Sequence, residues 1–114
     1  MARKPNKYYN KKTVVEGHEG IVFDSRKEAR HFLRLTVRQD KGEILNLKLQ
    51  PKFELTVNDC KICNYIADFS YELPDSHTLV VEDVKSSQTS KNPVFKLKKK
   101  LMLAIHKIEV SEVL

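Results

Sequence analysis

The sequence predicts a single mixed α/β domain, in the order helix, three strands, helix, strand, behind a short β extension. Two stretches place apolar residues at helical spacing beside end-capping residues, and four others show the apolar alternation of strands. With 114 residues, 40% of them hydrophobic, the chain can bury one modest core. No repeat or linker divides it, so we expect one domain over residues 12–114 and a basic, flexible tail over residues 1–11.

The first helix is predicted to begin at Ser25 and to stop at Gly42. Two short strands, KTVVE and GIVF, precede it around a turn at residues 17–20. Glu28 follows Ser25 by three residues, the spacing of a capping box, and glycine commonly ends a helix. The apolar residues at helical spacing between these ends are Ala29, Phe32, Leu33, Thr36 and Val37.

Three strands are predicted next, over residues 43–57, 61–73 and 78–85. Pro51 cannot donate a ladder hydrogen bond, so it marks a bulge or an edge within the first of them. Turn-forming residues near 58–59 and at 74–77 separate the strands. The second and third of these strands can therefore pair as a hairpin across the turn at 74–77.

The second helix is predicted over residues 94–105. Asn92 and Pro93 provide its start, because proline fits the first helical position well. A short polar loop connects it to the third strand, and residues 107–114 have the alternation of a last strand.

The charge is uneven along the chain, whose net charge is +6. Residues 1–12 carry five bases and no acid, and residues 85–100 carry six lysines and no acid. Two basic segments on a near-neutral body predict a polyanionic partner such as DNA. The alternative is that these charges only keep the protein soluble.

Basic residues also recur on the two predicted helices. Arg26, Arg30, Arg34 and Arg38 form a stripe along the first helix, and Lys96, Lys99 and Lys100 share one side of the second, with Lys98 elsewhere. No acid in their segment relieves the repulsion among the lysines. We expect DNA phosphates to contact these groups together with Lys11, Lys12 and Lys91. The alternative is a solvated helix face.

Two carboxylates and an ammonium are predicted to converge on the middle strands. Asp68 lies on the second strand, and Asp83 and Lys85 share a face of the third. If these strands pair across the turn at 74–77, the three side chains become neighbours. Paired carboxylates suit an oxygen-seeking cation such as Mg²⁺, which promotes phosphodiester hydrolysis. The alternative is an ordinary surface hairpin with scattered charges.

Strand alternation also predicts which neighbours point away from this group. Ala67 and Phe69 should share the face opposite Asp68. Glu82, although adjacent to Asp83, should be turned away from Lys85.

The pattern Asp…(Asp/Glu)-x-Lys on adjacent strands after a helix resembles the PD-(D/E)XK nuclease superfamily. The segments SRKEARHFLRL, GEILNLKLQPKFEL, YIADFSYEL, LVVEDVKS and FKLKKKLML are similar to those of small phage nucleases, and the resemblance covers about residues 8–114. The chain is also similar to phage Holliday-junction resolvases and to the transposon end-cleaving nuclease. The resemblance implies a restriction-endonuclease-like αβββαβ core with a mixed four-stranded sheet.

The resemblance also implies roles for individual residues. The metal ligands would be Asp68, Asp83, Glu28 and the backbone carbonyl of Val84. Lys85 would be the catalytic lysine, and Gln50 of the Gln-Pro motif would support the site. Two departures are that Ala67 replaces a proline and that Asp83 is one methylene shorter than the usual Glu. Glu28 has a competing role, because its side chain could instead close the capping box.

The expected activity is that of a Mg²⁺-dependent endodeoxyribonuclease, with Mn²⁺ able to substitute, acting on branched DNA in phage recombination. A resolvase makes two symmetric cuts, so we expect a homodimer. The alternatives are a nuclease that nicks or trims duplex DNA or cuts RNA, and a non-catalytic DNA-binding module. No organic cofactor is expected.

The remaining features predict a cytoplasmic protein without a zinc centre. No apolar run approaches the ~20 residues that span a bilayer, and no signal peptide is expected. Cys60 and Cys63 supply only half of a tetrahedral zinc site. We interpret them as ordinary strand cysteines, the alternative being a zinc shared across a dimer. The four histidines are scattered, and none is expected to be a ligand or a general base.

Overall fold

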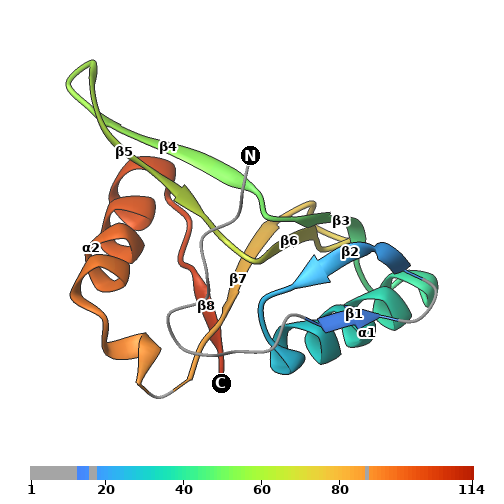
Figure 1. Cartoon of the computed structure of the whole chain (residues 1–114). Helices are drawn as coiled ribbons and strands as arrows, with labels where there is room; N and C mark the ends of the chain where they lie inside the picture. The colour runs from blue at the N-terminus through green and yellow to red at the C-terminus, as the bar shows by residue number, and fades with distance from the viewer. Residues whose placement is uncertain (1–12, 16–17, 87) are drawn as a thin grey trace.

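A four-stranded mixed sheet forms the centre of the fold, and one helix packs on each of its faces (Figure 1). The structure is a computed structural model that describes residues 13–15, 18–86 and 88–114, with side chains from residue 20 onward. The predicted tail over residues 1–11, which includes Lys11, and the adjacent Lys12 lie outside the described residues. The chain is therefore a single α/β domain, as predicted.

The sheet has the strand order β3-β6-β7-β8. Strand β3 (Leu45–Leu49) pairs antiparallel with β6 (Phe69–Glu72). Strand β6 in turn pairs antiparallel with β7 (Leu79–Val84). Strand β8 (Ser111–Val113) pairs parallel to β7. A parallel neighbour requires a crossover connection, and helix α2 provides it.

Helix α1 (Arg26–Asp40) has the predicted ends. The Glu28 N–H donates to Ser25 Oγ at 3.1 Å, which is the N-cap half of a capping box. Gly42 follows the helix with φ +76°, a conformation that glycine adopts without steric cost. The antiparallel ribbon of β1 (Thr13–Val15) and β2 (His18–Phe23) precedes α1, and β2 already begins within the predicted turn.

Helix α2 (Pro93–Leu101) also begins as predicted. Asn92 Oδ1 accepts hydrogen bonds from the Val94 and Phe95 N–H groups at 2.9 and 3.3 Å. A short 3₁₀ turn, η1 (Thr89–Lys91), precedes the helix, and a π-helical turn, η2 (Met102–His106), extends it. The predicted helix therefore corresponds to α2 and η2 together.

Each of the first two predicted strands is split in two. Strands β4 (Lys52–Val57) and β5 (Cys60–Ile66) form a separate hairpin that projects from the sheet beside α2 (Figure 1). Its turn residues Asn58 and Asp59 both have positive φ, as a two-residue hairpin turn of type I′ requires. The chain leaves the sheet at Gln50–Pro51 and re-enters it at Asp68.

A bulge at Asp68 corrects one predicted orientation. The Asp68 N–H donates to the Glu82 carbonyl at 3.2 Å, although Phe69 is also the ladder partner of Glu82. Two consecutive residues, Asp68 and Phe69, therefore lie opposite the single residue Glu82, and this extra residue reverses the alternation of side chains between the two faces. Ala67 packs in the core beneath α2 and Phe69 in the core beneath α1. The prediction that these two residues share a face is wrong for this reason.

The two faces of the sheet have separate cores. The buried members on the α1 side are Phe23, Ala29, Phe32, Leu35, Ile44, Phe69 and Tyr71. Those on the α2 side are Leu55, Tyr65, Ala67, Val81, Phe95, Met102 and Val110. No helix in the described part of the chain is long and apolar enough to cross a membrane.

A buried polar network on the α1 side involves Glu82. This carboxylate accepts hydrogen bonds from His31 Nε2 at 2.6 Å and from the Tyr71 hydroxyl at 2.7 Å. Burial alone would raise the pKa of Glu82, but the bonds from His31 and Tyr71 outweigh it and hold that pKa below its ordinary value. Glu82 therefore points away from Asp83, as strand alternation predicts, and stabilises the interface between α1 and the sheet.

Tyr71→Phe should lower the free energy of unfolding by about 1–2 kcal/mol, because it leaves a buried carboxylate oxygen without its donor. Urea denaturation at neutral pH measures the change. An unchanged denaturation midpoint would show that the hydroxyl contributes nothing to the stability of this interface.

Candidate active site

An open cleft of about 830 Å³ lies between the start of α1, the end of β7 and the segment leading to α2. Seven charged residues line it: Asp24, Glu28, Asp68, Asp83, Lys27, Lys85 and Lys91. The cleft therefore brings together the three predicted acids and the predicted catalytic lysine. The side chain of Lys27, which no sequence motif singled out, lies among them.

Asp68 and Asp83 form the centre of this group. The bulge places Asp68 opposite the end of β7, close enough to Asp83 for the charge of Asp83 to raise the pKa of Asp68. Asp68 Oδ2 accepts the Val84 N–H at 2.8 Å, and Asp83 Oδ2 accepts the hydroxyl of Tyr65. Asp83 is only 4% exposed. These two donors fix the orientation of both carboxyl groups.

Burial, followed by repulsion from Asp83 and Glu28, raises the pKa of Asp68 to about 8. The Val84 N–H acts in the opposite direction but does not compensate. A proton therefore remains on this pair near neutral pH unless another positive charge replaces it. Burial and the bond to Asp83 raise the pKa of Tyr65, so its hydroxyl stays a donor.

Lys85 borders the same two carboxyl groups. Its Nζ lies 3.5 Å from Asp83 Oδ1 and 4.4 Å from the centre of the Phe95 ring. Its backbone N–H donates to the Val113 carbonyl at 2.8 Å, and its carbonyl accepts from Lys27 Nζ at 2.8 Å. The backbone at Lys85 is thus anchored to β8 and α1, while the ammonium lies beside Asp83.

Glu28 joins the helix cap through its backbone, and which of the two predicted roles its side chain takes stays a prediction. Its backbone N–H bonds the capping Ser25, and its side chain is buried at the wall of the cleft. It lies close enough to Asp68 for its charge to raise the pKa of that residue. The helix cap thus positions this third acid beside the pair.

The donor chemistry of this cleft fits a divalent cation. Asp68 and Asp83 are paired oxygen donors whose mutual repulsion a cation would relieve, and Glu28 adds a third carboxylate nearby. Val84 also borders the cleft. Across the described ranges, no three His, Cys, Asp or Glu side chains already surround one point as ligands. The fit therefore rests on the Asp68–Asp83 pair.

Gln50 supports Asp68 through its backbone. It has φ +50°, and its N–H donates to the Asp68 carbonyl at 3.0 Å, where the chain leaves the sheet. Gln50, Glu28 and Asp68 also line a smaller neighbouring pocket of about 410 Å³. Gln50 thus supports the bulge through a hydrogen bond between its backbone and that of Asp68.

The basic residues have different surroundings. Arg26, Arg30, Arg34, Lys96 and Lys100 are exposed, and Lys91 is exposed at the cleft. Arg38 instead lies over the Tyr71 ring and within 3.8 Å of Glu43. Lys99 bonds Glu112 of β8 at 2.7 Å, so the prediction that no acid relieves the lysine cluster is wrong. This ion pair joins helix α2 to strand β8, so counting the charges within residues 85–100 could not reveal it.

The cysteines and histidines form no further site within the described residues. Cys60 and Cys63 are free thiols on β5. His106 Nε2 bonds the Glu54 carbonyl at 2.7 Å, and His31 belongs to the Glu82 network. A zinc ion shared across a dimer stays a prediction.

Asp68→Asn should raise the free energy of unfolding by about 1–3 kcal/mol at pH 8. The carboxyl loses its proton near pH 4 in the unfolded chain but only near pH 8 in the folded one, so rising pH destabilises the folded chain over this range. The gain should therefore grow from pH 4 to pH 8 and vanish below about pH 4. Denaturation at several pH values tests this, with Asp75→Asn in an exposed turn as control. A gain that does not depend on pH would contradict an origin in the ionisation of Asp68.

No curated protein and no solved structure matches this chain. A family model described as "Protein of unknown function (DUF1064)" matches residues 5–111, which include all of the cleft residues named above. The chain belongs to the DUF1064 family.

Proposed function

We propose that this protein is a Mg²⁺-dependent endonuclease of the PD-(D/E)XK type that hydrolyses phosphodiester bonds in DNA. The observation that carries the proposal is the convergence of Asp68, Asp83 and Lys85 in one open cleft. The element order of a helix, antiparallel strands, a second helix and a parallel last strand supports a restriction-endonuclease-like core.

Asp68 and Asp83 would bind the ion, with Glu28 and the Val84 carbonyl completing the ligands. When bound, Mg²⁺ supplies positive charge that polarises the phosphate and lowers the pKa of a water molecule. Tyr65 keeps Asp83 oriented, and the Val84 N–H does the same for Asp68. The acids thus provide a prearranged negative site.

Lys85 would act on the reacting phosphate. Its ammonium lies beside Asp83 and over the Phe95 ring, which limits its contact with solvent. There it can orient the attacking water and offset the negative charge that builds up in the transition state. The water oxygen would then bond to phosphorus as the water gives up a proton, the bond from phosphorus to one sugar oxygen would break, and that oxygen would take up a proton.

Branched DNA is the proposed substrate, and the setting is phage recombination in the host cytoplasm. Lys27 and Lys91 at the cleft, with the exposed arginines of α1, would contact phosphates without reading sequence. A junction-cutting enzyme would work as a homodimer with two such clefts. Manganese should replace magnesium, because both accept oxygen ligands in octahedral geometry.

Lys85→Ala should lower cleavage by more than about 100-fold, because the transition state loses its neighbouring cation. The assay presents supercoiled plasmid, linear duplex, single strands and a four-way junction, each with Mg²⁺ or EDTA. Binding without metal should change less than about threefold, since one phosphate contact is lost at most. Lys61→Ala, which changes an exposed lysine of β5 that does not line the cleft, is the matched control.

The substrate pattern separates the alternatives. Symmetric junction cutting that needs both Mg²⁺ and Lys85 supports the resolvase-like activity. Plasmid nicking without junction preference would leave a nuclease with a different target. Salt-sensitive binding with no cleavage of any substrate would refute the proposal in favour of a DNA-binding module.

Tyr65→Phe should raise the Mg²⁺ concentration needed for half-maximal cleavage by about 10–100-fold, because Asp83 loses the donor that orients it. A Mg²⁺ titration of the cleavage rate measures the shift. Tyr71→Phe, on the opposite face of the sheet, removes a similar hydroxyl and should leave the titration unchanged. Equal shifts in both variants would mean that a general loss of stability is being measured.

A further inference from the structure

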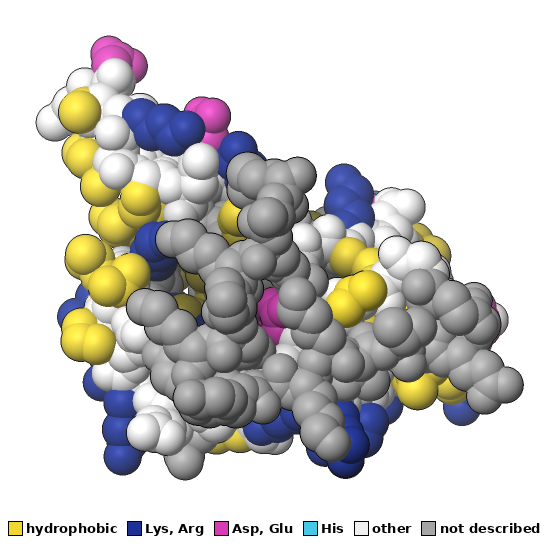
Figure 2. Space-filling view, viewed as in Figure 1, with side chains coloured by type: hydrophobic (Ala, Val, Ile, Leu, Met, Phe, Trp, Pro, Cys, Tyr) yellow, Lys and Arg dark blue, Asp and Glu magenta, His cyan; other side chains and the backbone are white. Residues whose placement is uncertain are grey.

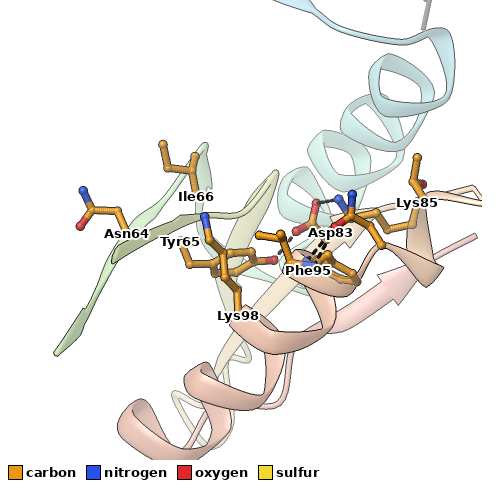
Figure 3. A pocket seen from close by; sticks show the side chains of 10 residues that line it. Asn64, Tyr65, Ile66, Asp83, Lys85, Phe95 and Lys98 are labelled. Carbon is orange, nitrogen blue, oxygen red and sulfur yellow. Dashed lines mark hydrogen bonds and ion pairs between the residues drawn. The ribbon is translucent and has the colours of Figure 1, made fainter. Parts of the chain in front are cut away.

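A second pocket opens on the α2 side of the candidate catalytic residues. It has a volume of about 410 Å³ and lies between β5 and the start of α2 (Figure 3). It shares Asp83, Lys85, Thr89 and Asn92 with the acidic cleft. The two hollows therefore meet at the point where the proposed reaction takes place.

The lining of this pocket combines apolar surface with positive charge. Ile66 of β5 and Val94 of α2 contribute to its lining and are 57% and 60% exposed. Lys85 and Lys98 supply two ammonium groups, and Figure 3 shows Lys98 extending from α2 towards β5. Ile66 and Val94 therefore give the pocket an apolar rim beside its two ammonium groups.

One nucleotide matches this combination in chemistry and in size. Its base and sugar can cover aliphatic side chains, while its phosphate pairs with the ammonium groups. The volume is also within the range of pockets for small ligands. A base within a continuous duplex is stacked on both faces and cannot enter such a pocket without first leaving the stack.

We infer that this pocket receives an unpaired nucleotide of the strand that is cut at Asp83 and Lys85. The inference rests on the proposed function and specifies its substrate class as DNA with an unpaired nucleotide next to the cleavage site. Flaps, gaps, branch points and single strands meet this requirement, whereas an uninterrupted duplex does not.

The first test measures binding in EDTA, where the proposed cleavage cannot occur. Fluorescence anisotropy compares a continuous duplex, a single strand and a flapped duplex of the same sequence. The single strand and the flap should bind about tenfold more tightly than the duplex. A 2-aminopurine at the junction should brighten on binding, because the pocket rim is aliphatic and the base leaves its stack. Equal affinity for all three DNAs would overturn the inference.

Matched variants assign the preference to this pocket. Ile66→Asp and Lys98→Ala should each remove most of the tenfold preference. Ile62→Asp and Lys61→Ala are the controls, because both residues lie on β5, are exposed, and do not line the pocket. Figure 2 shows apolar side chains along the left edge of the molecule, where the β4–β5 hairpin and α2 lie. The controls therefore also test whether this whole edge, rather than the pocket, binds the DNA. Equal losses in a variant and its control would reject the pocket.

The binding and cleavage assays can reject the subsite and the endonuclease separately. A strand preference that depends on Ile66, without cleavage of any substrate, would keep this subsite and reject the endonuclease. Efficient Mg²⁺-dependent cutting of an uninterrupted duplex, with no preference in EDTA, would keep the endonuclease and reject the subsite. Thermal unfolding of each variant checks that the substitutions at these positions leave the fold intact.

Discussion

The repulsion between the half-buried carboxyl group of Asp68 and the buried one of Asp83 is the constraint on which the candidate site depends. Like charges this close in a poorly solvated place destabilise the folded chain. The surrounding structure opposes that cost with donors from three directions, namely Tyr65, the Val84 N–H and the Lys85 ammonium. None of them removes the repulsion from Glu28 on the cleft wall. A divalent cation would relieve all of it at once, which is why we regard the arrangement as functional.

The backbone irregularities at the sheet edge position this pair. Gln50 and Pro51 interrupt one predicted strand, and the bulge at Asp68 interrupts the next. The hydrogen bonds from Gln50 to Asp68 and from Ala67 to Pro51 hold the two breaks opposite each other. The β4–β5 hairpin then leaves the sheet towards α2. Because β5 diverges at this point, a pocket opens between it and α2, beside Asp83.

Local chemistry made the helices and the face of β7 predictable. Ser25 and Asn92 accept backbone N–H groups within their own segments, so their capping roles are visible in a short window. The bulge at Asp68 was not predictable, because the alternation of apolar and polar residues does not reveal where one extra residue is inserted. Only Pro51, in the preceding strand, indicated an irregularity. Tyr65 and Lys27 were missed for a related reason. Their contacts with Asp83 and Lys85 join distant segments, and only the tertiary arrangement brings them together.

Adjacent acids on β7 show how environment separates structural from functional carboxylates. Glu82 points towards α1, where His31 and Tyr71 satisfy it and hold its pKa below the ordinary value. On the opposite face, Asp83 meets Asp68, whose pKa is raised by burial and by neighbouring negative charge. A carboxylate already satisfied by donors gains little from a cation, whereas an acid crowded by other acids gains much. The two environments, one residue apart on the same strand, therefore support a structural role for Glu82 and the metal-binding role that we propose for Asp83.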